Sequence, residues 1–97
     1  MSMDIHYGLQ AMFGKPIVQL SEVSEAFFGM KYATAKAKVS SHEFPIPAFR
    51  LHEESEANKG TKVPLLIRVN DLADYVVRKH EEERARMESI YGKFHRH

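Results

Sequence analysis

The stretch from residue 20 to residue 50 constrains the fold more than any other part of the chain. It predicts two short helices joined at Gly29-Met30, followed by the first strand of a hairpin. The first helix has an apolar face at i, i+3 and i+4, formed by Val23, Ala26 and Phe27. Ser21 is the expected N-cap, and Gly29 can take the left-handed conformation that ends a helix. This layout predicts a helix-turn-helix with a β wing, an excisionase- or MerR-like fold that is mainly α.

The second helix is expected near residues 31–41. Residues 33–39 alternate apolar and polar, which is also a strand pattern, but three of the apolar residues are alanine. We favour a helix because alanine is the best helix former and is depleted in strands. One side of a helical wheel would carry Tyr32, Ala35 and Val39, with Lys36 at its edge. The other side would carry Thr34, Ala37, Lys38 and Ser41.

The outward side of this second helix is small and basic. Small side chains let a helix approach the floor of a DNA groove while its lysines reach phosphates. The same pattern also fits an ordinary solvated helix that carries a few lysines, and residues 31–41 alone do not separate the two interpretations.

The wing is expected from two strands around a long polar loop. Pro45 and Pro47 exclude a central strand, so the first strand would begin near Ala48 and the second would cover residues 64–69. Residues 52–62 between them are polar and contain both acids and lysines. We expect the basic residues of the wing, Arg50, Lys59 and Lys62, to contact DNA. The acids of the loop would be turned away from it.

The two ends of the chain complete the expected domain. Residues 4–13 form a candidate helix, capped by Asp4, that packs behind the helix-turn-helix, and residues 17–20 are extended. A last helix would start at Asn70 and continue to about residue 91, with an apolar face of Leu72, Tyr75, Val76 and Val77. That face disappears over residues 78–86. We therefore divide the chain into a DNA-binding domain, residues 1–77, and a charged helical tail, residues 78–97. The tail either pairs with another copy, giving a homo-oligomer, or frays.

Composition excludes several classes of protein. The 97 residues suffice for one domain, and the chain has no cysteine and a net charge of only +1. No apolar run is long enough for a membrane span and no signal peptide is visible, so a cytoplasmic protein is expected. The six histidines lack a metal-ligand spacing, and no catalytic or nucleotide-binding motif occurs. We expect no cofactor, no metal and no enzymatic activity.

Five groups of residues, in order along the chain, match one known family. They are Ala11-Met12-Phe13-Gly14; Ile17, Leu20, Glu22-Val23 and Phe27-Phe28-Gly29; Thr34-Ala35-Lys36 with Lys38; residues 44–51 (FPIPAFRL); and residues 61–64 with 68–76. Together they resemble the pyocin activator (PrtN-type) family of bacterial transcriptional activators. The resemblance implies double-stranded DNA as a partner, with RNA polymerase as a second, and the control of bacteriocin or prophage genes.

The resemblance and the basic helix together give a set of expected DNA contacts. Tyr32, Thr34, Lys36 and Lys38 would lie in or beside the major groove, and Lys31, Arg50, Lys59 and Lys62 would hold phosphates. Two other functions remain open. One is a phage excisionase or directionality factor, which shares this plan and bends DNA. The other is a protein–protein interaction module in which the basic helix is only solvated.

Overall fold

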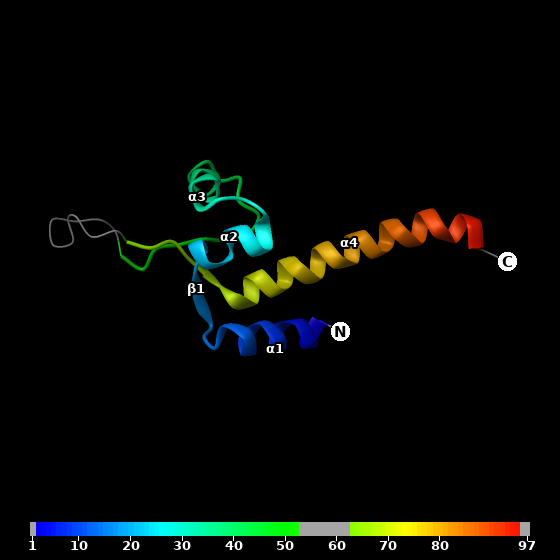
Figure 1. The fold of residues 1–97 in the computed structure, drawn as a ribbon, viewed down its shortest axis with the longest axis horizontal. Coiled ribbons are helices and arrows are strands. Elements are labelled where there is room, and N and C mark those ends of the chain that lie inside the picture. Colours follow the sequence, from blue (N-terminus) through cyan, green and yellow to red (C-terminus); the bar gives the residue numbers. More distant parts are fainter. Residues whose placement is uncertain (1, 53–62, 96–97) are drawn as a thin grey trace.

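The computed structural model describes residues 2–52 and 63–95, and it is mainly helical (Figure 1). Its elements are α1 (Ser2–Phe13), β1 (Ile17–Gln19), α2 (Leu20–Phe28), α3 (Tyr32–Ser40), β2 (Leu66–Arg68) and α4 (Val69–His95). The predicted architecture, a small winged helical domain with a long C-terminal helix, is confirmed. The strand alternative for residues 33–39 is wrong, because these residues lie inside α3.

The two strands of the sheet come from distant parts of the chain. β1 pairs antiparallel with β2, and Val18 lies opposite Ile67. Both side chains are buried, which explains the register, because a shift by one residue would turn them to solvent. The predicted partner of residues 64–69 was instead the segment from Ala48 to Leu51. That pairing is present only as one bridge between Phe49 and Leu66.

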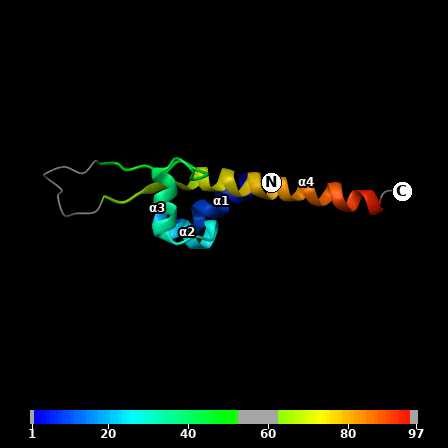
Figure 2. The same cartoon turned by 90° about the horizontal axis from the view of Figure 1, so that it is seen from above.

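The arms of the wing lie side by side as they leave the body of the domain (Figures 1 and 2). Phe49 and Leu66 exchange two backbone hydrogen bonds, of 2.9 and 2.7 Å. A longer ladder does not form on the side toward α3, because Pro45 and Pro47 have no amide hydrogen to donate. β1 therefore takes the main pairing with β2, and the wing begins as an extension of that pair.

The start of α2 differs from the prediction. The helix begins at Leu20 with Gln19 as its N-cap, so Ser21 lies inside the first turn. The backbone amide of Gln19 donates to the Glu22 carboxylate at 2.9 Å, and the amide of Leu20 donates to the Leu65 carbonyl at 2.9 Å. The helix thus starts where the chain leaves the sheet. Its end is as predicted, since Gly29 has φ 65° and closes the helix with a bond to the Glu25 carbonyl.

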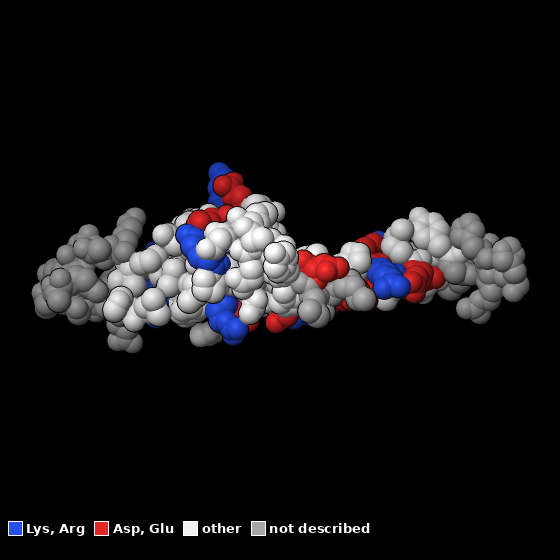
Figure 3. Space-filling view, turned by 90° about the horizontal axis from the view of Figure 1, so that it is seen from below, with Lys and Arg blue, Asp and Glu red and all other residues white. Residues whose placement is uncertain are grey.

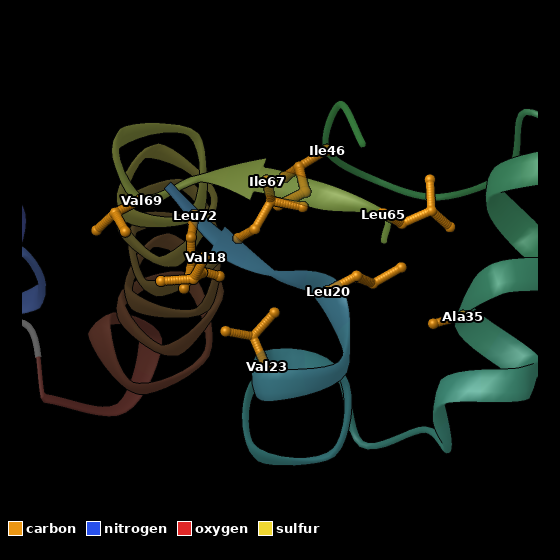
Figure 4. Close-up of a cluster of buried hydrophobic side chains, with 9 residues drawn as sticks. All are labelled: Val18, Leu20, Val23, Ala35, Ile46, Leu65, Ile67, Val69 and Leu72. Carbon is orange, nitrogen blue, oxygen red and sulfur yellow. The ribbon is translucent and has the colours of Figure 1, made fainter. Parts of the chain in front are cut away.

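One hydrophobic core joins the sheet, α2, α3 and the first turn of α4 (Figure 4). Its buried side chains are Val18, Leu20, Val23, Ala35, Ile46, Leu65, Ile67, Val69 and Leu72. Aromatic rings extend this core at its edge, where Phe28 lies 4.7 Å from Phe44 and 5.1 Å from Tyr75, measured between ring centroids. This packing fixes α2, and through α2 it fixes the position of α3.

The first helix packs along the start of α4, behind the helix-turn-helix, as predicted (Figure 1). His6 lies 2.7 Å from Asp74, and Gln10 donates to Asn70 at 3.0 Å. Two predicted caps are wrong. α1 starts at Ser2, which leaves Asp4 within the first turn. α4 starts at Val69, whose amide donates to the Pro16 carbonyl, so Asn70 bonds α1 instead of capping α4.

The second half of α4 projects from the domain. From Arg78 to Tyr91 every side chain is exposed, and the helix continues to His95, beyond the predicted end. At 1.5 Å per residue α4 is ~40 Å long. The radius of gyration is 17.3 Å, against about 12.5 Å for a compact domain of this length. None of the helices in the described residues is long and apolar enough to cross a membrane.

Charges of both signs lie next to one another on this projecting half (Figure 3). Arg84 approaches Glu81 at 3.8 Å and Glu88 at 3.3 Å. Arg86 donates to Glu83, and this hydrogen bond, together with the nearby positive charge, lowers the pKa of the Glu83 carboxyl. Pairs at i, i+3 and i, i+4 support a solvated helix modestly.

Candidate nucleic-acid interface

The helix α3 has one side in the core and one in solvent. Ala35 is fully buried and points toward Leu20 (Figure 4). Tyr32 and Val39, on the same side, are half-buried and pack against the core. The predicted inward side of the helix is therefore confirmed. Tyr32 was also predicted to reach DNA, and its ring contributes to the packing of α3 on the domain.

The outward side of α3 carries most of the predicted contacts. Lys31, Thr34 and Lys36 are exposed, and Lys38 is half-buried near the end of the helix. Within residues 2–52 and 63–95, no carboxylate lies within ion-pair distance of these three lysines. By contrast, Lys15 in the turn before β1 pairs with Glu22 at 3.7 Å. The positive charge of α3 is thus available to an external anion.

The N-terminal end of α3 adds to this positive potential. The first bond within the helix runs from the Ala35 amide to the Lys31 carbonyl, at 3.0 Å, so the amides before Ala35 have no acceptor in the helix. The N-cap residue, Lys31, makes no side-chain capping bond, and the first turn contains no acid. A helix end with free amides, a positive dipole and an adjacent lysine favours negatively charged groups such as phosphates.

The C-terminal end of α3 contains a feature that the sequence analysis missed. His42 has φ 61°, a left-handed conformation that residues other than glycine rarely adopt. Its amide donates to the Val39 carbonyl at 3.1 Å, and the amide of Glu43 donates to the Lys38 carbonyl at 2.8 Å. These two bonds are those of a Schellman turn, which usually has glycine at the left-handed position. With histidine there instead, the sequence lacked the usual signal, and an exposed imidazole lies at the end of α3.

The wing supplies one predicted residue that the structure describes. Arg50 is exposed, and its Nε lies 3.4 Å from the Val63 carbonyl, a weak contact across the two arms. Arg50 therefore lies on the stem of the wing, with its guanidinium open to solvent. The other two predicted wing residues, Lys59 and Lys62, lie outside the described residues. The structure thus gathers Lys31, Thr34, Lys36 and Lys38 on α3 and places Arg50 on a separate element.

The arrangement is that of a helix presented by a helix-turn-helix beside a β wing. The side of the domain that carries α3 is opposite the side that carries α1 (Figure 1). Within the described residues, no three histidine, aspartate or glutamate side chains are placed so that they could hold a metal ion together.

Comparison with known proteins identifies one family. No curated protein and no solved structure gave a significant match. A family model described as pyocin activator protein PrtN matches residues 7–83, which is more than three quarters of the chain. The matched region begins in α1, contains the whole helix-turn-helix and the wing, and ends near the middle of α4. This chain therefore belongs to the pyocin activator protein PrtN family.

Proposed function

We propose that this protein is a sequence-specific DNA-binding regulator that activates transcription of bacteriocin genes. The proposed role is not enzymatic, and its partners are double-stranded DNA and RNA polymerase. The observation that carries the proposal is the outward side of α3, where Lys31, Thr34 and Lys36 are exposed. Among the residues that the structure describes, no carboxylate lies within ion-pair distance of Lys31 or Lys36. Membership of the pyocin activator family supports the activating role.

The proposed binding mode places α3 in the major groove. Its outward residues between the lysines are small, Ala33 and Ala37, so the helix backbone can approach the base edges closely. Thr34 can donate to or accept from a base edge, and Lys36 and Lys38 reach bases or phosphates at the groove walls. In the same orientation the N-terminus of α3 and Lys31 face a backbone phosphate.

The wing supplies a second point of contact in this proposal. Arg50 lies on its stem, and Lys59 and Lys62 follow in its loop. Contacts of this kind go to phosphates, so they position the domain without reading sequence. Specificity would then come from α3, and a large share of the affinity from the lysines and Arg50.

The test compares two lysine substitutions by fluorescence anisotropy on a promoter fragment selected from genomic DNA. Lys36→Ala should weaken binding and lower the slope of log K against log salt by ~0.9, the value expected for one lost phosphate contact. Lys15→Ala removes the same charge from the turn before β1, which lies on the other side of the domain from α3 (Figure 1). It should leave the salt slope unchanged.

The outcomes of this experiment separate the candidate functions. Equal effects of the two substitutions would mean that α3 is not the DNA-contacting helix. Loss of all fragments to random competitor would contradict sequence-specific binding and favour a protein–protein interaction module. Specific binding at a recombination site, with bending of the DNA, would replace the activator by an excisionase-like factor.

A further inference from the structure

An open groove lies between the N-terminal end of α1 and α4, away from the helix-turn-helix. It encloses about 680 Å³. Its residues are Asp4 and Ile5 of α1 with Val76, Val77, His80, Glu81 and Arg84 of α4. Ile5 is 38% exposed, and the two valines are only half-buried. A monomer thus leaves an apolar strip in solvent, bordered by charged side chains.

A second apolar strip lies on the projecting half of α4. Met87, Ile90 and Tyr91 are 39%, 41% and 50% exposed, and their spacing of i, i+3 and i+4 puts them on one side of the helix. The same side continues toward the domain through Glu83 and Arg84, then His80, and then the groove valines, at intervals of three and four residues. The two strips therefore lie on one face of one helix, with charged residues between them.

This face is complementary to itself when two copies run antiparallel. Suppose that Val77 lies opposite Ile90 of a second copy. Because the residue numbers of opposite residues have a constant sum in an antiparallel pair, Val76 then lies opposite Tyr91, and His80 lies opposite Met87. The distal apolar strip of each copy then covers the groove of the other. The contact is isologous, so each strip is covered once in a closed dimer.

The charges between the two strips agree with the same register. Glu83 lies opposite Arg84 of the second copy near the two-fold axis, and Arg84 lies opposite Glu83. On the flanks, Lys79 meets Glu88, and Glu81 meets Arg86. All these side chains are more than half exposed, with values of 56% for Glu83 and 61% for Arg84. In a parallel, in-register pair, each charged residue would instead lie beside the same residue of the second copy, and the two like charges would repel.

We propose that a second copy of this chain occupies the groove, in an antiparallel dimer formed by residues 76–91 of α4. The overlap from Val76 to Tyr91 is ~24 Å long at 1.5 Å per residue. Each copy contributes its own α3 outside this contact, so the dimer presents two recognition helices related by a two-fold axis. Such an arrangement suits a palindromic target. The dimer itself does not depend on the proposed DNA binding.

Cysteine cross-linking tests the register, because the natural sequence has no cysteine. Two variants are prepared, Val77→Cys and Ile90→Cys, and are oxidised separately and as an equal mixture, without DNA. A disulfide requires Cα atoms within about 7 Å. In the antiparallel register, Val77 of one copy is level with Ile90 of the other, 13 residues further along the helix. The two Val77 residues of a dimer therefore lie ~20 Å apart along the axis, and so do the two Ile90 residues. We expect cross-linked dimers in the mixture and none in either variant alone.

A charge exchange gives an independent readout by sedimentation velocity. Glu83→Arg should raise the dissociation constant of the dimer at least about tenfold, because it puts a new cation of each copy opposite Arg84 of the other copy. Adding Arg84→Glu restores the pairs with their signs reversed and should restore dimerisation. Far-UV circular dichroism of all variants checks that α4 remains helical. Because no DNA is present, these results do not depend on whether α3 binds DNA.

Two results would overturn the proposal. Cross-linking of either cysteine variant with itself, as readily as in the mixture, would mean that the tails pair in parallel. A wild-type protein that sediments as a monomer throughout the micromolar range would mean that the groove is not a dimer contact.

Discussion

The two helices of the helix-turn-helix are equal in length and differ in how they are held. α2 buries Leu20, Val23 and Ser24, and at its start the Gln19 amide donates a hydrogen bond to the Glu22 carboxylate. α3 buries only Ala35, and its N-cap makes no side-chain bond. The core therefore determines α2, whereas α3 is attached to the core by one small residue and the edges of two larger ones. Few residues of α3 are needed for folding, so most of its surface is available for recognition.

The largest effect is expected where α2 enters the core. Leu20 is completely buried, and its amide also bonds the Leu65 carbonyl. Leu20→Ala should lower the free energy of unfolding by about 2–5 kcal/mol, since it removes buried methyl groups and leaves a cavity. Urea denaturation followed by circular dichroism measures the change. A loss below about 1 kcal/mol would contradict the assignment of Leu20 to the centre of the core.

A smaller effect is expected where α3 touches the core. Ala35 faces Leu20 with no exposed surface, so Ala35→Leu must displace α3 or its neighbours (Figure 4). We expect a loss of about 1–3 kcal/mol in stability from overpacking. DNA affinity should fall more than the lost stability explains, because α3 itself is moved. Ala37→Leu, on the exposed side, is the matched control for stability alone, because Ala37 lies on the proposed DNA-contacting side, and it should leave the stability nearly unchanged.

The smallest effect compares the ends of the two helices. Gly29 and His42 both have positive φ, 65° and 61°, but only Gly29 avoids the steric cost of a side chain there. His42→Gly should therefore raise the free energy of unfolding by about 0.5–1 kcal/mol, after the entropy cost of glycine is subtracted. Gly29→Ala should lower it by about 1 kcal/mol. Thermal unfolding of both variants decides this, and a destabilised His42→Gly protein would mean that the imidazole makes a stabilising contact.

Local sequence signals predicted the parts of the fold that local physics governs. The end of α2 followed from Gly29, because only a residue without a side chain adopts that conformation easily. The helical state of α3 followed from its alanines, and the inward side followed from Tyr32, Ala35 and Val39. Local signals did not predict features that depend on contacts between residues far apart in the sequence, such as the starts of α2 and α4. These are set by bonds from Leu20 to Leu65 and from Val69 to Pro16.

The candidate site was predictable to the same extent. Thr34 and Ala37 were expected on the outward side of α3, where they lie, because helical spacing alone fixes which residues share a side. Lys36, expected at the edge of the inward side, is exposed, and Lys38, expected on the outward side, is half-buried. The left-handed His42 was not predicted, since its conformation follows from how the chain turns from α3 toward the wing. The groove between α1 and α4 was also missed, because no sequence pattern shows that the N-terminal end of α1 lies alongside Val76 and Val77.

By itself, the sequence determined a helix-turn-helix with a small basic helix and a C-terminal helix too long for its domain. Only the tertiary structure decided that β1 rather than the segment near Phe49 is the main partner of β2, and where the helices start. The physical reason is the range of the forces involved. Helical periodicity and left-handed turns act over a few residues, whereas strand pairing and burial join segments that are about 50 residues apart, as in the pair of Val18 and Ile67.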